Sequence, residues 1–275
     1  MTATTFDQGR LGYLHTSLSR ALRGELTKTR SVRSTYWTLF VAVLAGIGVS
    51  ALTAWGTVAI WNDLKPEERA DFEAVPASTG GLLITLITMM VFGVLVVTSE
   101  YASGQIRISL SAVPGRSMLL SAKACVVGAV ALGAGALMVF LSFAIGQALF
   151  ATKDIGVSIT DPGVFWGLAR VALAVGLVSL LAMAVGALVR HTAGAITLAI
   201  GGLLLPQMVL GFAPDSVEEK ILPFLPGGAL GAMQPPAAKD PATWMDSPMG
   251  GMAILVAWVV ALFAAALFLA NRRDA

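Results

Sequence analysis

Charged residues are scarce in this chain. Asp, Glu, Lys and Arg together make up 12% of its 275 residues, about half of the share found in soluble domains. Apolar residues make up 56% and the mean hydropathy is +0.80. This composition excludes an ordinary soluble enzyme and a disordered tail, and a net charge of only +2 argues against a nucleic-acid-binding protein. The class that remains is a polytopic integral membrane protein.

Residues that carry catalysis or bind metals are also few. The single cysteine, Cys125, excludes an internal disulfide framework, and the two histidines, His15 and His191, argue against a His-based metal site. The chain contains no Gly-Lys pair, hence no Walker A motif, and neither GxGxxG nor HExxH. We therefore expect no catalytic residue, no metal and no cofactor in this chain, and we predict that it is not itself an enzyme.

Long apolar runs are abundant and define the expected fold. A helix needs about 20 apolar residues to cross the roughly 30 Å hydrocarbon core of a membrane. No run contains Asp, Glu or Lys, and we find no alternating pattern typical of barrel strands. The prediction is an all-α membrane protein with six spanning helices. They cover residues 37–60, 80–98, 124–150, 164–189, 193–213 and 251–270.

The distribution of Lys and Arg predicts the orientation. With six spans, both termini fall on one side, and that side carries twelve Lys and Arg residues against five on the other, over 69 residues each. The positive side is the cytoplasmic one. We therefore expect a cytoplasmic N-terminus over 1–36 without a cleavable signal, a transmembrane domain over 37–270, and a cytoplasmic tail over 271–275.

The N-terminal segment has an amphipathic pattern over 11–34. Leucines recur at helical spacing, which predicts a helix lying in the membrane interface. The alternative is a positive cluster that serves only to orient the first span. The stripe consists of Leu11, Leu14, Leu18, Leu22 and Leu26.

Two polar segments between the spans are informative. In 99–123, Ile106, Leu110 and Val113 share one helical face, and Pro114 ends that helix, so we expect a short cytoplasmic helix; a solvated connector is the alternative. The outer segment 214–250 contains an apolar but Pro- and Gly-interrupted stretch, which is typical of a packed or re-entrant element.

Strongly polar side chains inside the spans are limited to Gln147, Arg170 and Gln207, which are the candidates for a translocation path. Arg170 lies near the outer boundary and is expected to snorkel or to pair with Asp154 or Asp161. So few ionisable groups argue against a proton-coupled transporter, and energy for any transport is expected from a separate chain.

Three stretches resemble bacterial ABC-2 type transporter permeases, particularly actinobacterial ones. Residues 22–37, LRGELTKTRSVRSTYW, are similar to the elbow helix and the entry into the first span of that family. The loop EYASGQIR over 100–107, followed by Leu110, Pro114, Arg116 and Lys123, resembles its coupling-helix signature. The outer stretch LPGGALG over 225–231 is similar to the segment before its last span.

The resemblance implies a type V exporter-like fold and a division of labour between chains. Two permease subunits, identical or different, would pair, and two separate ATPase subunits holding ATP and Mg would drive export of a drug, antibiotic, peptide or lipid across the bacterial cell membrane. The implied coupling residues are Glu100, Tyr101, Gly104, Ile106, Arg107, Leu110, Pro114 and Arg116. The implied elbow residues are Arg23, Glu25, Lys28, Arg30 and Arg33.

Two other functions stay open on the residues alone. A membrane scaffold or sensor could bind a cytoplasmic partner through the same loop without moving anything. A stand-alone secondary transporter is a further alternative, which the scarcity of charges inside the spans disfavours.

Overall fold

The computed structural model describes residues 18–31, 33–105, 116–235 and 244–272. Within these ranges the chain is helical and has no strand. Six helices are long and apolar enough to cross a membrane, which confirms the expected all-α, multi-pass architecture. They are α2 (Arg33–Ile60), α5 (Leu82–Ala102), α7 (Arg116–Phe150), α8 (Val164–Val189), α9 (Thr192–Leu210) and α12 (Pro248–Arg272).

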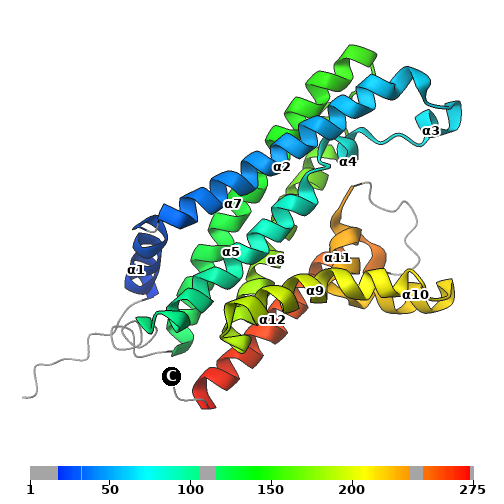
Figure 1. Ribbon diagram of the computed structural model, residues 1–275. Coiled ribbons are helices and arrows are strands. Elements are labelled where there is room, and N and C mark those ends of the chain that lie inside the picture. Colours follow the sequence, from blue (N-terminus) through cyan, green and yellow to red (C-terminus); the bar gives the residue numbers. More distant parts are fainter. Residues whose placement is uncertain (1–17, 32, 106–115, 236–243, 273–275) are drawn as a thin grey trace, which may run out of the picture.

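Short elements gather at the two ends of the bundle (Figure 1). One end, the α1 end, holds α1 (Leu18–Ser31) with the last turns of α5 and α12. The opposite end, the α11 end, holds the remaining short helices. These are η2 (Trp61–Asp63), α3 (Pro66–Ala70), α4 (Ala74–Ser78), η3 (Ala151–Lys153), α10 (Asp215–Ile221), η4 (Leu222–Phe224), α11 (Pro226–Met233) and η5 (Trp244–Asp246).

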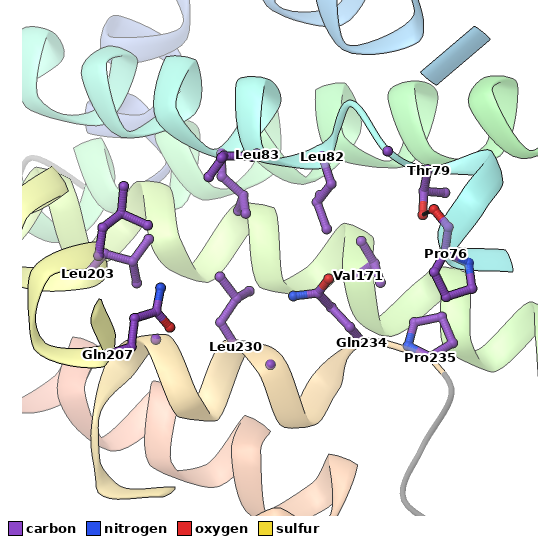
Figure 2. Close-up of a pocket in the computed structure, with 15 residues that line it drawn as sticks. Pro76, Thr79, Leu82, Leu83, Val171, Leu203, Gln207, Leu230, Gln234 and Pro235 are labelled. Carbon is purple, nitrogen blue, oxygen red and sulfur yellow. Dashed lines mark hydrogen bonds between the residues drawn. The ribbon is translucent and has the colours of Figure 1, made fainter. Parts of the chain in front are cut away.

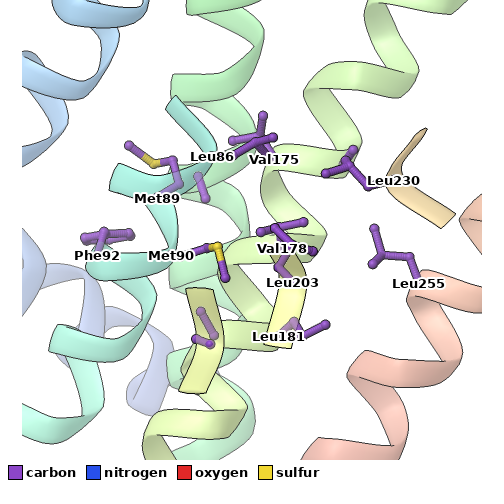
Figure 3. Packing of buried hydrophobic residues seen from close by; sticks show 14 of the residues in the cluster. Leu86, Met89, Met90, Phe92, Val175, Val178, Leu181, Leu203, Leu230 and Leu255 are labelled. Carbon is purple, nitrogen blue, oxygen red and sulfur yellow. The ribbon is translucent and has the colours of Figure 1, made fainter. Parts of the chain in front are cut away.

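The centre of the bundle is the pair α5 and α8. Within their spanning windows, 56% of α5 and 67% of α8 is buried, against 17% for α9 and for α12. Side chains of α5, α9, α11 and α12 converge on Val175, Val178 and Leu181 of α8 (Figure 3). The two central helices touch at Gly93, where a β-carbon would overlap the carbonyl oxygen of Ser179. Only glycine allows this approach, as is common between membrane helices.

Several helices extend beyond their apolar runs. α7 has 35 residues, a length of about 52 Å at 1.5 Å per residue, which exceeds the roughly 30 Å of a hydrocarbon core. It begins at Arg116 rather than at 124, and α5 continues to Ala102 rather than ending at 98. The polar loop expected over 99–123 is therefore shorter than predicted, because both of its flanks are helical. Residues 106–115, which carry most of the expected cytoplasmic helix, lie outside the described residues.

The N-terminal helix and the 214–250 segment also differ in detail from the prediction. α1 ends at Ser31, so Arg33 begins α2 and does not belong to the helix predicted over 11–34. In the 214–250 segment, α11 is packed against α8, α9 and α12, with Ala229 and Met233 fully buried. Pro226 stands at its first helical position, where the missing N–H costs nothing.

Candidate functional site

The α1 end is held together first by apolar packing. Ala21 of α1 lies against Leu119 and Ala122 of α7, with Leu22 and Met118 at the edge of this contact. The buried face of α1 thus runs through Ala21 and Glu25, one helical turn apart. Leu26, on the predicted leucine stripe, is exposed, as a residue facing lipid from an interfacial helix would be.

Four charged side chains form a closed cluster beside this contact, which we call the charge cluster. The Lys123 Nζ donates to Glu25 Oε2 at 2.6 Å and to Glu100 Oε1 at 2.9 Å. The Lys28 Nζ donates to Glu25 Oε1 at 3.0 Å and to Glu100 Oε1 at 3.2 Å. Charges of opposite sign alternate around the ring, so the cluster is neutral overall and joins α1, α5 and α7.

Burial makes the charge cluster energetically sensitive. The side chains of Lys123, Glu25 and Glu100 are 4%, 5% and 8% exposed, whereas that of Lys28 is 44% exposed. Buried charges are tolerated when they are paired, and removing one partner leaves an uncompensated charge. Glu100 Oε2 is buried and has no hydrogen-bond partner among the described residues. The cluster is therefore a rigid but costly connection.

Lys28 occupies the rim of the charge cluster. Burial alone would lower the pKa of Lys28, but its hydrogen bond to Glu25 and the negative charges of Glu100 and Glu25 outweigh that effect. The pKa of Lys28 is therefore raised above its ordinary value. The ammonium stays protonated throughout the physiological range and holds the two carboxylates together.

The turn between α8 and α9 is tied to the same end of α5. The Arg190 guanidinium lies 5.0 Å from the centre of the Tyr101 ring, a cation–π distance. The Thr192 hydroxyl lies 3.0 Å from that of Thr98. His191 Nδ1 accepts the Gly194 N–H at 3.2 Å, so this histidine caps α9.

The structure describes only some of the coupling residues that the sequence predicted. Glu100 belongs to the charge cluster and Tyr101 to the cation–π pair, while Gly104 has a φ of +70°, a turn conformation that favours glycine. Arg116 is the first residue of α7, and Arg30 lies near the end of α1. The remaining predicted coupling residues lie outside the described residues; they are Ile106, Arg107, Leu110 and Pro114.

Of the predicted elbow residues, two enter the charge cluster. Glu25 and Lys28 make its α1 side, whereas Arg23 is exposed. Lys123, which binds both carboxylates, was not among the predicted site residues. In the sequence it stands directly before an apolar run and within the stretch that resembles the coupling-helix signature, and neither signal reveals its partners 23 and 98 residues away.

The α11 end carries a cavity of about 320 Å³, which we call the amide cavity. It lies between α5, α8, α9 and α11, and its walls include Leu82, Leu203 and Leu230. Gln207 and Gln234 lie on either side of Leu230 and line the same space (Figure 2). α11 approaches α9 closely because position 227 is glycine; a β-carbon there would lie 2.6 Å from Gln207 Oε1.

A second cavity of about 360 Å³, the charged cavity, adjoins the first. Pro76 and Pro235 line both cavities. Glu73 and Arg170 line the charged cavity but form no salt bridge, either with each other or with another residue of the described ranges. Pairing of Arg170 with Asp154 or Asp161, one of the two alternatives expected for it, is therefore absent.

The carboxylate of Asp161 is engaged locally, because its Oδ2 accepts the Ser158 N–H at 2.8 Å. The guanidinium of Arg170 keeps its Nε buried without a hydrogen-bond partner among the described residues.

The three residues predicted for a translocation path are separated. Gln207 lines the amide cavity and Arg170 the charged cavity. Gln147 lines neither of them, because its amide is bonded to backbone. Its Oε1 accepts the Val157 N–H at 2.7 Å and its Nε2 donates to the Ala74 carbonyl at 3.5 Å. Glu73 lines the charged cavity and Gln234 the amide cavity. The sequence did not predict either residue, since both stand in loop sequence without a motif.

The described residues hold no group of three or more His, Cys, Asp or Glu side chains arranged to bind a metal ion. No protein-family model and no curated protein matches the chain. The function must therefore be argued from the residues at the two ends of the bundle.

Proposed function

We propose that this protein is the membrane-spanning permease subunit of an ATP-binding cassette exporter, with the α1 end on the cytoplasmic side. A separate ATPase subunit would supply the energy, because the sequence has no nucleotide-binding motif. Two permease subunits and two ATPase subunits would form the working complex, as the resemblance to ABC-2 permeases implies.

The observation that carries this proposal is the charge cluster. The polar loop leaves α5 after Ala102 and re-enters at Arg116. Glu100 stands just before this loop, and Lys123 stands two turns into the helix that follows it. Lys123 donates hydrogen bonds both to Glu100 and to Glu25 of α1. A force applied to the loop would thus move α1, α5 and α7 as one unit, and α5 is one of the two central helices. This is the mechanical connection that an external ATPase needs.

The ends of the other spans would follow the same movement. The α8–α9 turn is joined to α5 through Arg190 and Thr192. Because α5 and α8 pack without a gap at Gly93, displacement of α5 is passed to α8 rather than absorbed. The cavities at the α11 end lie between these same helices and would change shape with them.

Co-purification with the ATPase tests the proposal directly. The protein would be tagged in its native host, extracted in mild detergent, and its bound chains identified by mass. We expect an ATPase subunit in equal number to the permease, lost in the loop variants Ile106→Asp and Arg107→Glu, which should still reach the membrane. Thr88→Ser, a change on α5 remote from the loop, is the matched control and should retain the ATPase.

The two alternative functions give different results. A scaffold or sensor would retain a cytoplasmic partner, but vesicles containing the complex would show no ATP-dependent movement of cargo. A stand-alone secondary transporter would purify without an ATPase under conditions that preserve other such complexes. Full ATP-dependent export by Ile106→Asp and Arg107→Glu would contradict the assigned role of the loop.

A further inference from the structure

We infer that the two adjoining cavities at the α11 end form one binding site for a zwitterionic amphiphile, such as a phospholipid with an ammonium-bearing headgroup. The inference deepens the proposed function, because it names the class of cargo. Binding itself needs only this chain. The two ideas can therefore fail separately.

The headgroup specificity follows from the charged cavity. Glu73 and Arg170 face the same space of about 360 Å³ without bonding to each other. Arg170 stands in α8, within a helix apolar enough to span a membrane, and its buried Nε has no partner in the described part of the chain. An anion in the cavity would supply the acceptor that this guanidinium lacks. Phosphate and carboxylate fit its fork of donors.

Glu73 makes the site different from a simple anion site. An anion bound at Arg170 would be repelled by a second negative charge in the same cavity. A ligand that also carries a cation would place that group at Glu73 and satisfy both charges at once. Phosphoethanolamine-type headgroups have this arrangement, with a phosphate and an ammonium a few bonds apart.

The amide cavity would hold the acyl chain and the ester group of the amphiphile. It continues from the charged cavity at Pro76 and Pro235 and extends along α5 and α9 to Leu86 and Leu203. These residues are apolar, as an acyl chain requires. The amides of Gln207 and Gln234 have no side-chain hydrogen bond among the described residues, and both can donate to ester carbonyls. Apolar side chains combined with a few polar groups that can fix a ligand's orientation are typical of ligand sites.

Binding of lipids that differ only in the headgroup tests this inference. The purified protein, without an ATPase, would be offered three single-chain lipids of equal chain length in a neutral detergent. They are lysophosphatidylethanolamine, the anionic lysophosphatidylglycerol, and a cationic alkylamine. Native mass spectrometry would measure how much of each is retained. We expect the ethanolamine lipid to be retained at least about ten-fold better than either single-charge lipid.

Variants assign this preference to the two charges. Arg170→Gln should lower retention of the ethanolamine lipid and of the glycerol lipid by about ten-fold. Glu73→Gln should lower retention of the ethanolamine lipid and raise that of the glycerol lipid, removing the preference. Arg69→Gln is the matched control, since Arg69 is a nearby charge outside both cavities, bonded to the Asn62 carbonyl; it should change nothing.

Other outcomes overturn the inference. Equal retention of all three lipids would mean that the headgroup is not recognised. A preference for the anionic lipid that survives Glu73→Gln would mean a simple anion site at Arg170. If Arg170→Gln fails to fold, two other variants still test the inference. Glu73→Gln changes an exposed residue and should remove the preference. Arg170→Lys conserves the charge and should keep the order of preference. None of these results bears on whether an ATPase co-purifies.

Discussion

Charged side chains are paired at one end of the bundle and unpaired in a cavity at the other. At the α1 end, Glu25, Lys28, Glu100 and Lys123 form ion pairs with one another at distances of 3.2 Å or less. At the α11 end, Glu73 and Arg170 face a shared cavity unpaired. Paired buried charges join the helices that carry them, whereas the exposed Glu73 and the half-buried Arg170 are available to a ligand. We therefore propose that the α1 end is a mechanical end and the α11 end a binding end.

The largest loss of stability is expected from Lys123→Met. It leaves Glu25 and Glu100 buried without their shared cation, which costs about 3–5 kcal/mol by analogy with other buried ion pairs. The apparent melting temperature in mild detergent would measure it. The triple variant Lys123→Met, Glu25→Gln and Glu100→Gln should recover part of the loss, because the one charge of the cluster that remains, on Lys28, is half exposed and can be solvated by water. A wild-type melting temperature for Lys123→Met alone would contradict the buried cluster.

A change of the packing at the α11 end should be smaller. In Gly227→Ala the new methyl group would lie 2.6 Å from Gln207 Oε1 and 2.7 Å from the Leu203 carbonyl oxygen, so overpacking should cost about 1–3 kcal/mol. Gly231→Ala is the matched control, since it lines the same cavity and has nothing within 4 Å of the added atom. Equal melting temperatures for the two variants would mean that α11 is not closely packed on α9.

The turn between α8 and α9 belongs to the mechanical end but contains no ion pair. His191→Ala removes the acceptor for the Gly194 N–H and should cost about 1 kcal/mol, as loss of other N-caps does. His191→Asn keeps an acceptor and should melt close to the wild type. If both variants lose the same stability, the contribution of His191 does not come from capping.

The smallest effect is expected from Lys28→Met, because Lys28 is half exposed. We expect a loss of no more than about 1 kcal/mol at pH 7. Since the pKa of Lys28 is raised in the folded protein, its contribution is complete below the unfolded pKa of about 10.4 and is lost as pH rises through the folded pKa. Wild type and Lys28→Met should therefore differ at pH 7–9 and converge at higher pH; a difference that persists there would exclude this linkage.

The sequence could predict the fold far better than the sites. Apolar runs of helical length determine the spans, because lipid satisfies no backbone hydrogen bond. Only the helix ends were misplaced, since Glu100 and Lys123 look like loop residues until each is seen to have a partner. For the α1 end, the sequence predicted Glu25, Lys28 and Glu100 as site residues through the family resemblance, but not the lysine that joins them.

At the α11 end the sequence identified single residues and not a site. Arg170 and Gln207 stand out as polar side chains within apolar runs. Glu73, Gln234 and Pro235 carry no such signal, because loops are expected to be polar. They reach the cavities only because α4, which packs on α2 and α7, and the chain after α11 line the same space as α8.

By itself, the sequence determined the six spans, the scarcity of catalytic groups and the excess of positive charge on one side. These depend on composition and periodicity, which act locally along the chain. The tertiary structure decided which charges meet. Pairing of residues 98 positions apart, and the absence of pairing between Glu73 and Arg170, depend on how whole helices pack, and helix packing follows from the combined shape of many side chains rather than from any short stretch of sequence.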